Sequence, residues 1–247
     1  MALTDKLTAI ANAIRAKGGT SGKMTLAEMP NKIAAISTGN AAEPYIEETY
    51  DESGWLISAT LHGYTKFRNY MFHNCIQLTS VSLPSGLTEI GSYTFYNCSK
   101  LALTNLPSGI TEIGESAFYN CPKLALTNLP SGVTSINLST FHDCRNLALT
   151  NLPSGLTEIG SNAFKGCSKL ALTSIPSGVT SISDNAFKGC TSLASITFEG
   201  KPRTISNNAF SNCTNLTTIN VPWAEGAVAN APWGATNATI NYNYTGA

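Results

Sequence analysis

Residues 78–100 read LTSVSLPSGLTEIGSYTFYNCSK, and variants of this 23-residue unit follow one another along the chain. Each unit carries a cysteine, with a phenylalanine three residues before it and a leucine three residues after it. The seven cysteines are Cys75, Cys98, Cys121, Cys144, Cys167, Cys190 and Cys213. A fixed period of this size is typical of a solenoid, in which each repeat is one coil and neighbouring coils bury each other's apolar faces. The sequence therefore predicts a protein built to present a surface.

One coil is predicted to be mostly extended. Residues 78–83 form a strand with inward-facing apolar side chains. A Pro-Ser-Gly turn at 84–86 leads to a second extended segment over 87–90. Residues 92–97 predict one short helical turn, with Phe95 pointing inward. The expected fold class is a repeat solenoid, mostly β with one short helical turn per coil, plus a small N-terminal helical segment.

Four middle repeats depart from this strand pattern, because they read LALTNLP or LALTSIP. Each has a leucine where the first repeat has serine. These leucines are Leu103, Leu126, Leu149 and Leu172. A shifted register or a bulge would turn this leucine inward, and the sequence leaves the geometry open.

The residue before each cysteine is always asparagine, aspartate or glycine. These three residue types tolerate a positive φ, so we expect a left-handed turn here that ends the helical piece. A ladder of asparagine hydrogen bonds is the rival interpretation, and Gly166 and Gly189 have no side chain to continue it.

The cysteines are predicted to be buried free thiols. Identical residues in successive coils stack in register, and parallel Cβ vectors do not give the crossed geometry of a disulfide. Free cysteine is readily buried. The chain has no CxxC pair, so we expect no zinc or redox site and no cofactor.

Composition limits the classes of partner. The 247 residues have a formal net charge of zero, and only 12% are charged, which is too little for a cationic field that attracts nucleic acid or an anionic membrane. No apolar stretch approaches the roughly 18 residues of a membrane span. Polar residues from Asp5 to Arg15 interrupt any signal-peptide core, so we expect the protein to be made and folded in a cytoplasm.

Residues 1–37 have a helical period and share no position with the repeats. They predict a three-turn amphipathic helix and a second short helix after Pro30. The shared apolar face is Leu3, Leu7, Ile10, Ile14, Ile33 and Ile36. Such short helices need further packing, so this face must fold on itself, join copies in a homo-oligomer or pack on a partner. We interpret 1–37 as an attachment module, followed by a linker over 38–44.

The two ends of the repeat array are predicted to be caps. Residues 45–77 read as a hairpin and a degenerate repeat, in which Trp55 takes the position of Leu78. Residues 78–222 are the regular repeats, and 223–247 form the C-terminal cap, with Trp223 and Trp233 covering the last coil.

No catalytic or metal-binding arrangement is predicted. Residues 17–23 read KGGTSGK, one residue too short for a phosphate loop and followed by methionine instead of serine or threonine. His73 and His142 lie three coils apart, about 15 Å, which is too far to share a metal. His73 lies close to Cys75 in sequence, but an inward-facing structural thiol is the better interpretation. We therefore expect a protein that is not an enzyme.

A candidate partner-binding surface lies around the predicted helical turn, where the repeats vary most. Its residues are Tyr93, Tyr96, Tyr119, His142, Lys165 and Lys188. Aromatic rings, imidazoles and amines are suited to contacts with protein or glycan. The alternative is an exposed edge under no particular demand.

The repeated pattern hPxGhTxIGxxAFxxCxxL resembles the BspA-type leucine-rich repeats, which are common in bacterial surface and phage-borne proteins. The resemblance covers about residues 64–222. It implies a right-handed solenoid with a protein-binding or adhesive role and no enzymatic activity. The N-terminal stretch LTAIANAIRAKGGTSGKMTLAEMPNKIAAI resembles a small module on phage tail and other phage structural proteins.

Together the two resemblances imply a phage or prophage tail-associated protein. Residues 1–37 would then dock on a virion structural protein, and the repeats would meet a protein or surface glycan on a bacterial cell. The expected location is the virion, or the host cytoplasm before assembly. The alternative is a bacterial cell-surface or secreted leucine-rich-repeat adhesin.

Overall fold

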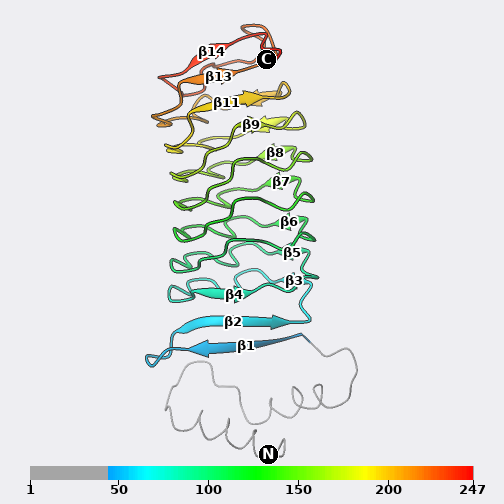
Figure 1. Ribbon diagram of the computed structural model, residues 1–247, viewed down its shortest axis with the longest axis vertical. Coiled ribbons are helices and arrows are strands. Elements are labelled where there is room, and N and C mark those ends of the chain that lie inside the picture. Colours follow the sequence, from blue (N-terminus) through cyan, green and yellow to red (C-terminus); the bar gives the residue numbers. More distant parts are fainter. Residues whose placement is uncertain (1–43, 247) are drawn as a thin grey trace, which may run out of the picture.

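The computed structural model describes residues 44–246, which form a single column of stacked coils with the C-terminus at one end (Figure 1). The predicted helices of 1–37 lie outside the described residues, as does nearly all of the predicted linker. Within 44–246 the chain consists of strands and turns, and no helix is present. The predicted solenoid is therefore confirmed, whereas the predicted helical turn in each coil is wrong.

The coils contribute to two sets of short strands, in which paired strands of neighbouring coils run parallel, although the middle coils contribute to the second set only. One set comprises β2 (Leu56–His62), β4 (Ser80–Ser82), β9 (Ser174–Ile175), β11 (Ser195–Phe198), β13 (Thr218–Asn220) and β14 (Thr239–Asn241). The other comprises β3 (Lys66–Phe67), β5 (Glu89–Ile90), β6 (Glu112–Ile113), β7 (Ser135–Ile136), β8 (Glu158–Ile159), β10 (Ser181–Ile182) and β12 (Thr204–Ile205). The first strand, β1 (Tyr45–Tyr50), pairs antiparallel with β2.

Hydrogen bonding explains why the segment 92–97 is not a helix. The N–H groups of Tyr93, Phe95 and Asn97 donate to carbonyl groups of the next coil at 2.8–2.9 Å. The N–H groups between them donate to the carbonyl three residues earlier. Tyr93 and Asn97 have φ values of 58° and 59°, which interrupt a right-handed helical path. The segment is therefore a chain of tight turns that also carries a hydrogen-bond ladder along the column.

The centre of the core is a row of stacked phenylalanine rings. Adjacent ring centroids are 5.1–5.6 Å apart, with interplanar angles of 6–16°. The row is Phe72, Phe95, Phe118, Phe141, Phe164, Phe187 and Phe210, all buried. Stacked aromatic pairs add stability beyond the area they bury, so this row ties each coil to the next.

Six of the seven cysteines are buried beside this row, and none of the seven is in a disulfide. The Sγ atoms of Cys98, Cys121, Cys144, Cys167, Cys190 and Cys213 lie 2.9–3.1 Å from the carbonyl oxygen of the phenylalanine in the preceding coil. A thiol is small and apolar yet can donate this hydrogen bond. These two properties together account for cysteine at this position.

Cys75 corrects the prediction that all seven cysteines are buried, because it is only partly buried. It belongs to the first coil, where the described chain provides no preceding phenylalanine carbonyl. Burial, and then Glu48, raise the pKa of the Cys75 thiol. The thiol therefore stays protonated at neutral pH, which does not favour a nucleophile paired with His73.

The extra leucine of the middle repeats points inward through a shifted register. Leu126, Leu149 and Leu172 are buried, and Leu103 is half-buried. The Ala125 N–H donates to the Leu103 carbonyl, a residue separation of 22. Inward leucines at positions three apart cannot follow the alternation of a strand. The segments 101–107, 124–130 and 147–153 contain no strand, whereas 170–176, with Leu172 and Ile175 both buried, still contains the two-residue strand β9.

A strand hairpin lies at one end of the described column and two buried tryptophans at the other, and the hairpin differs from the prediction by one residue in register. The hairpin of β1 and β2 forms as expected, but Ser58 pairs with Ser80, so Leu56 rather than Trp55 lies opposite Leu78. Trp55 is consequently 49% exposed. At the other end, Trp223 and Trp233 are buried, and both rings pack against Phe198.

Candidate functional site

The candidate site lies where the chain turns around each cysteine. We call this surface the turn ridge and define it as the two residues on either side of each cysteine: 73–77, 96–100, 119–123, 142–146, 165–169, 188–192 and 211–215. The cysteine faces the core, and the flanking residues are half-buried or exposed. The same backbone geometry repeats in every coil, so side chains at one position form a line along the column.

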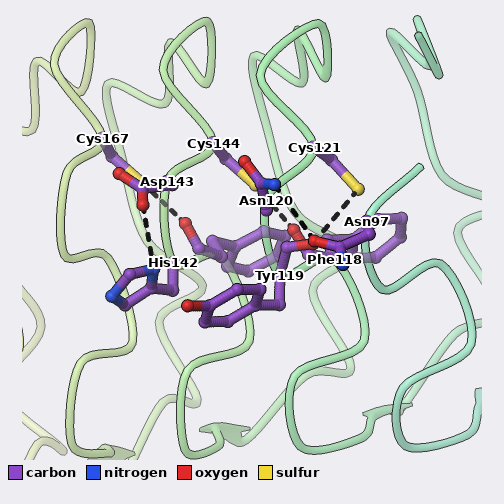
Figure 2. Close-up of polar contacts among 10 residues, drawn as sticks. Asn97, Phe118, Tyr119, Asn120, Cys121, His142, Asp143, Cys144 and Cys167 are labelled. Carbon is purple, nitrogen blue, oxygen red and sulfur yellow. Dashed lines mark hydrogen bonds and ion pairs between the residues drawn. The ribbon is translucent and has the colours of Figure 1, made fainter. Parts of the chain in front are cut away.

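The residue before each cysteine is left-handed, as predicted. The φ values are 52–75° at Asn74, Asn97, Asn120, Asp143, Gly166, Gly189 and Asn212. Asparagine hydrogen bonds are also present in the first coils. Asn97 Nδ2 donates to Asn74 Oδ1 at 2.9 Å, and Asn120 Nδ2 donates to Asn97 Oδ1 at 3.0 Å (Figure 2). The left-handed turn is thus general, and the asparagine ladder is a local addition.

A second left-handed position was not predicted. It lies five residues before the cysteine, with φ values of 52–62° at Tyr70, Tyr93, Ser116, Ser139, Asn162 and Asn185. Tyrosine and serine rarely adopt this conformation. Only Asn162 and Asn185, whose residue type tolerates a positive φ, indicate this left-handed position in the sequence. The two left-handed residues bracket the tight turns that replace the predicted helical turn.

Aromatic rings on the turn ridge form a stacked row that extends over four coils. The ring row is His73, Tyr96, Tyr119 and His142, with centroid distances of 4.5–5.0 Å and interplanar angles of 10–14°. Tyr70 and Tyr93 stack beside it at 4.9 Å. Because each inner ring is covered on both faces, a ligand can reach only its edge and polar atoms.

His142 lies at the end of the ring row, close to Asp143 and Lys165. Its Nδ1 lies 3.3 Å from Asp143 Oδ2 (Figure 2). Burial lowers the pKa of His142, Asp143 opposes this effect, and Lys165 lowers the pKa further. The imidazole is therefore neutral at pH 7 and contributes a polar ring edge instead of a charge.

The structure brings most of the predicted binding residues into one line. Tyr96, Tyr119, His142, Lys165 and Lys188 occupy the same position in successive coils, two residues before the cysteine. Tyr93 lies in the neighbouring line and donates from its hydroxyl to Glu115 Oε1 at 2.9 Å. The predicted attachment face, from Leu3 to Ile36, lies outside the described residues.

The described residues contain no candidate metal site. In residues 44–246 no group of three histidine, cysteine, aspartate or glutamate side chains converges to hold a metal ion. A groove of about 600 Å³ near the C-terminal cap contains Asp184 and Arg203 but none of the predicted site residues. In this part of the molecule, no helix is long and apolar enough to span a membrane.

The stacked coils, the buried leucine, phenylalanine and cysteine lines and the short parallel strands define a leucine-rich-repeat solenoid. The family description "BspA type leucine rich repeat region" matches residues 65–190 and 157–226, with six copies. The chain belongs to this family. The match begins at residue 65, so it does not bear on the predicted phage-type module at 1–37.

One solved structure supports the same fold, and a second shows only a weaker similarity. A leucine-rich-repeat protein of T. pallidum is 27% identical, with a TM-score of 0.56 over 70% of this chain and 88% of that one. A leucine-rich-repeat protein of Bacteroides ovatus is 21% identical, with a TM-score of 0.43 over 75% of this chain and 61% of that one. No curated protein matches the chain.

Proposed function

We propose that this protein is a non-enzymatic binding protein of the bacterial cell-surface type, and that its turn ridge contacts a protein or glycan partner. Membership of the BspA-type family supports the surface role, because the family resemblance implies an adhesive function. The ring row is the observation that identifies the turn ridge as the proposed binding surface. It places four aromatic or imidazole side chains in register on one edge of the solenoid.

A second observation supports the turn ridge over the strand faces. Outside the turn ridge, the LALTNLP segments of the middle coils are nearly identical from coil to coil and present small residues, for example Ala102, Ala125 and Ala148. The corresponding ridge residues change from tyrosine to histidine to lysine along the column. Binding surfaces need such chemical variety, and aromatic residues are enriched in them.

The virion role predicted for 1–37 has a weaker basis. It rests on the sequence of that segment alone, and neither the family match nor the structural relatives support it. We therefore place the cell-surface role first and keep the virion as the competing outcome of the test.

Location separates the two functions. An antibody against residues 78–222 is applied to intact cells of the producing bacterium and to purified phage particles from the same culture. The cell-surface proposal expects labelling of intact cells that is lost after brief protease treatment. Labelling of phage particles but not of cells would replace it with the virion role.

A further inference from the structure

We propose that the turn ridge binds a linear acidic polysaccharide that lies along the axis of the solenoid. This inference rests on the proposed function, since it names a ligand class for the same ridge. It arises from how the charges are distributed over the coils.

Basic residues are concentrated on the turn ridge, although the whole chain has a formal net charge of zero. Residues 44–246 contain ten lysines and arginines, and six of them lie on the ridge. Only one of the twelve aspartates and glutamates in this range does so, Asp143. The six basic residues are Lys100, Lys123, Arg145, Lys165, Lys169 and Lys188. The ridge is therefore a local cationic strip on a neutral protein.

These six side chains are available to an anion. Lys100, Lys123, Arg145 and Lys169 are exposed, and Lys165 and Lys188 are half-buried. No ion pair within residues 44–246 involves any of the six. Away from the ridge, by contrast, the Nζ atom of Lys66 lies 2.6 Å from Glu89 Oε2.

The spacing of the charges favours a linear ligand. The six residues occupy five successive coils, from the coil of Cys98 to that of Cys190. At the spacing of neighbouring strands, these coils cover about 19 Å, or one positive charge per roughly 4 Å. A small anion would meet one or two of these charges, whereas a chain with an acidic group on each sugar unit would meet most of them.

The ring row argues against single-stranded nucleic acid as the polyanion. Proteins hold unpaired bases by stacking them on free aromatic faces. On the turn ridge the inner rings already stack on one another at 4.5–5.0 Å, so no face is free there. Hydroxyl and imidazole edges remain, and these suit hydrogen bonds to sugar hydroxyl groups.

The test measures binding of the full chain to heparin, with neutral dextran of similar length as a control. The ridge variant is Lys100→Gln/Lys123→Gln/Lys169→Gln. The matched control is Lys66→Gln/Lys201→Gln/Arg203→Gln, which removes the same charge elsewhere. We expect the ridge variant to bind heparin at least roughly tenfold more weakly at low salt. The slope of the logarithm of the binding constant against the logarithm of salt concentration should indicate about two to three fewer ionic contacts. The matched control should change less than about twofold.

A charge-retaining variant, Lys100→Arg/Lys123→Arg/Lys169→Arg, should still bind heparin, which separates charge from altered structure. Equal weakening in the ridge and control variants would overturn the inference. Absence of heparin binding at low salt, or tighter binding to duplex DNA than to heparin, would also overturn it. In each case labelling of intact cells would still support the proposed surface function, so the two failures are distinguishable.

Discussion

The Sγ atom of Cys121 donates a hydrogen bond to the carbonyl oxygen of Phe95, 3.0 Å away in the preceding coil. The same oxygen accepts the N–H of Cys98 at 3.1 Å. The thiol therefore supplies a second partner for a buried carbonyl group, and the same double acceptance recurs at Phe72, Phe141, Phe164 and Phe187. Buried polar groups that lack partners are costly, so the cysteine line has a structural role in the stacking of coils.

Thiol labelling should distinguish Cys75 from the other cysteines. The six buried thiols are inaccessible, and burial raises their pKa, in Cys213 to about 11. We expect the native protein to be labelled first at Cys75 and slowly elsewhere, and the denatured protein to be labelled at all seven positions. Mass spectrometry after a short exposure to an alkylating reagent measures this order. Rapid native labelling of Cys144 would contradict the burial of the line.

Removing one ring from the centre of the phenylalanine row should destabilise the protein strongly. Phe141→Ala leaves a cavity between Phe118 and Phe164, whose rings both stack on Phe141. Core substitutions of this kind cost roughly 3–5 kcal/mol. The control is Tyr119→Ala, which removes a half-buried ring from the ring row and should cost less. Denaturant unfolding gives both free energies, and equal losses would contradict the assignment of core and surface.

The left-handed position before the cysteine should discriminate between substitutions. Gly189 has a φ of 74°, and a Cβ atom there would come no closer than 3.8 Å to its neighbours. Gly189→Asn should therefore be tolerated, whereas Gly189→Val forces a β-branched residue into a strained conformation that costs roughly 1–3 kcal/mol. Thermal unfolding of the two variants measures the difference. Equal stability would show that the backbone is not held left-handed here.

Gly166 provides a matched contrast to Gly189. A Cβ atom at Gly166 would collide with the carboxylate of Asp143. Gly166→Asn should therefore be more destabilising than Gly189→Asn, although both positions have nearly the same φ. A combined Gly166→Asn/Asp143→Gly variant should regain part of the lost stability, because it removes the carboxylate with which the new Cβ atom collides. No recovery would contradict the collision.

His142 should make the protein less stable in mild acid. Its pKa is lowered in the folded state, chiefly by burial. The folded protein therefore binds fewer protons than the unfolded chain, and stability falls as the pH drops below the ordinary histidine value of about 6.5. Replacement by His142→Gln should remove this part of the pH dependence. Unfolding free energies at pH 7.5 and pH 5.5 for both proteins provide the check, and identical slopes would contradict it.

The repeat period allowed much of the fold to be predicted. Positions 23 residues apart share one environment, so the phenylalanine row, the cysteine line and the left-handed residue before Cys98 followed from residue type alone. The stacking of Tyr119 on His142 also follows, because they occupy the same position in adjacent coils. All of the candidate partner residues except Tyr93 share one repeat position, so the sequence already implies that they lie on one line.

Other features depend on hydrogen bonds that cross between coils. Residues 92–97 have a helical pattern of side chains, but ladder bonds to the next coil compete with a helix and replace it. Trp55 was misplaced because the pairing of β2 with β4 is shorter by one residue than the repeat. Nothing in the composition of Tyr93 indicates its positive φ. Each of these features is determined by contacts with a neighbouring coil, so the local sequence alone does not predict it.

The ladder of backbone hydrogen bonds from the turn segments also has a mechanical consequence. These bonds join each coil to the next and run along the axis of the column. A force that pulls the two ends apart would load successive interfaces in series, and the coils would detach one at a time. Each detached coil would release 23 residues, or a contour length of roughly 75–80 Å. Under tension the protein would therefore lengthen in small regular steps and act as an extensible tether.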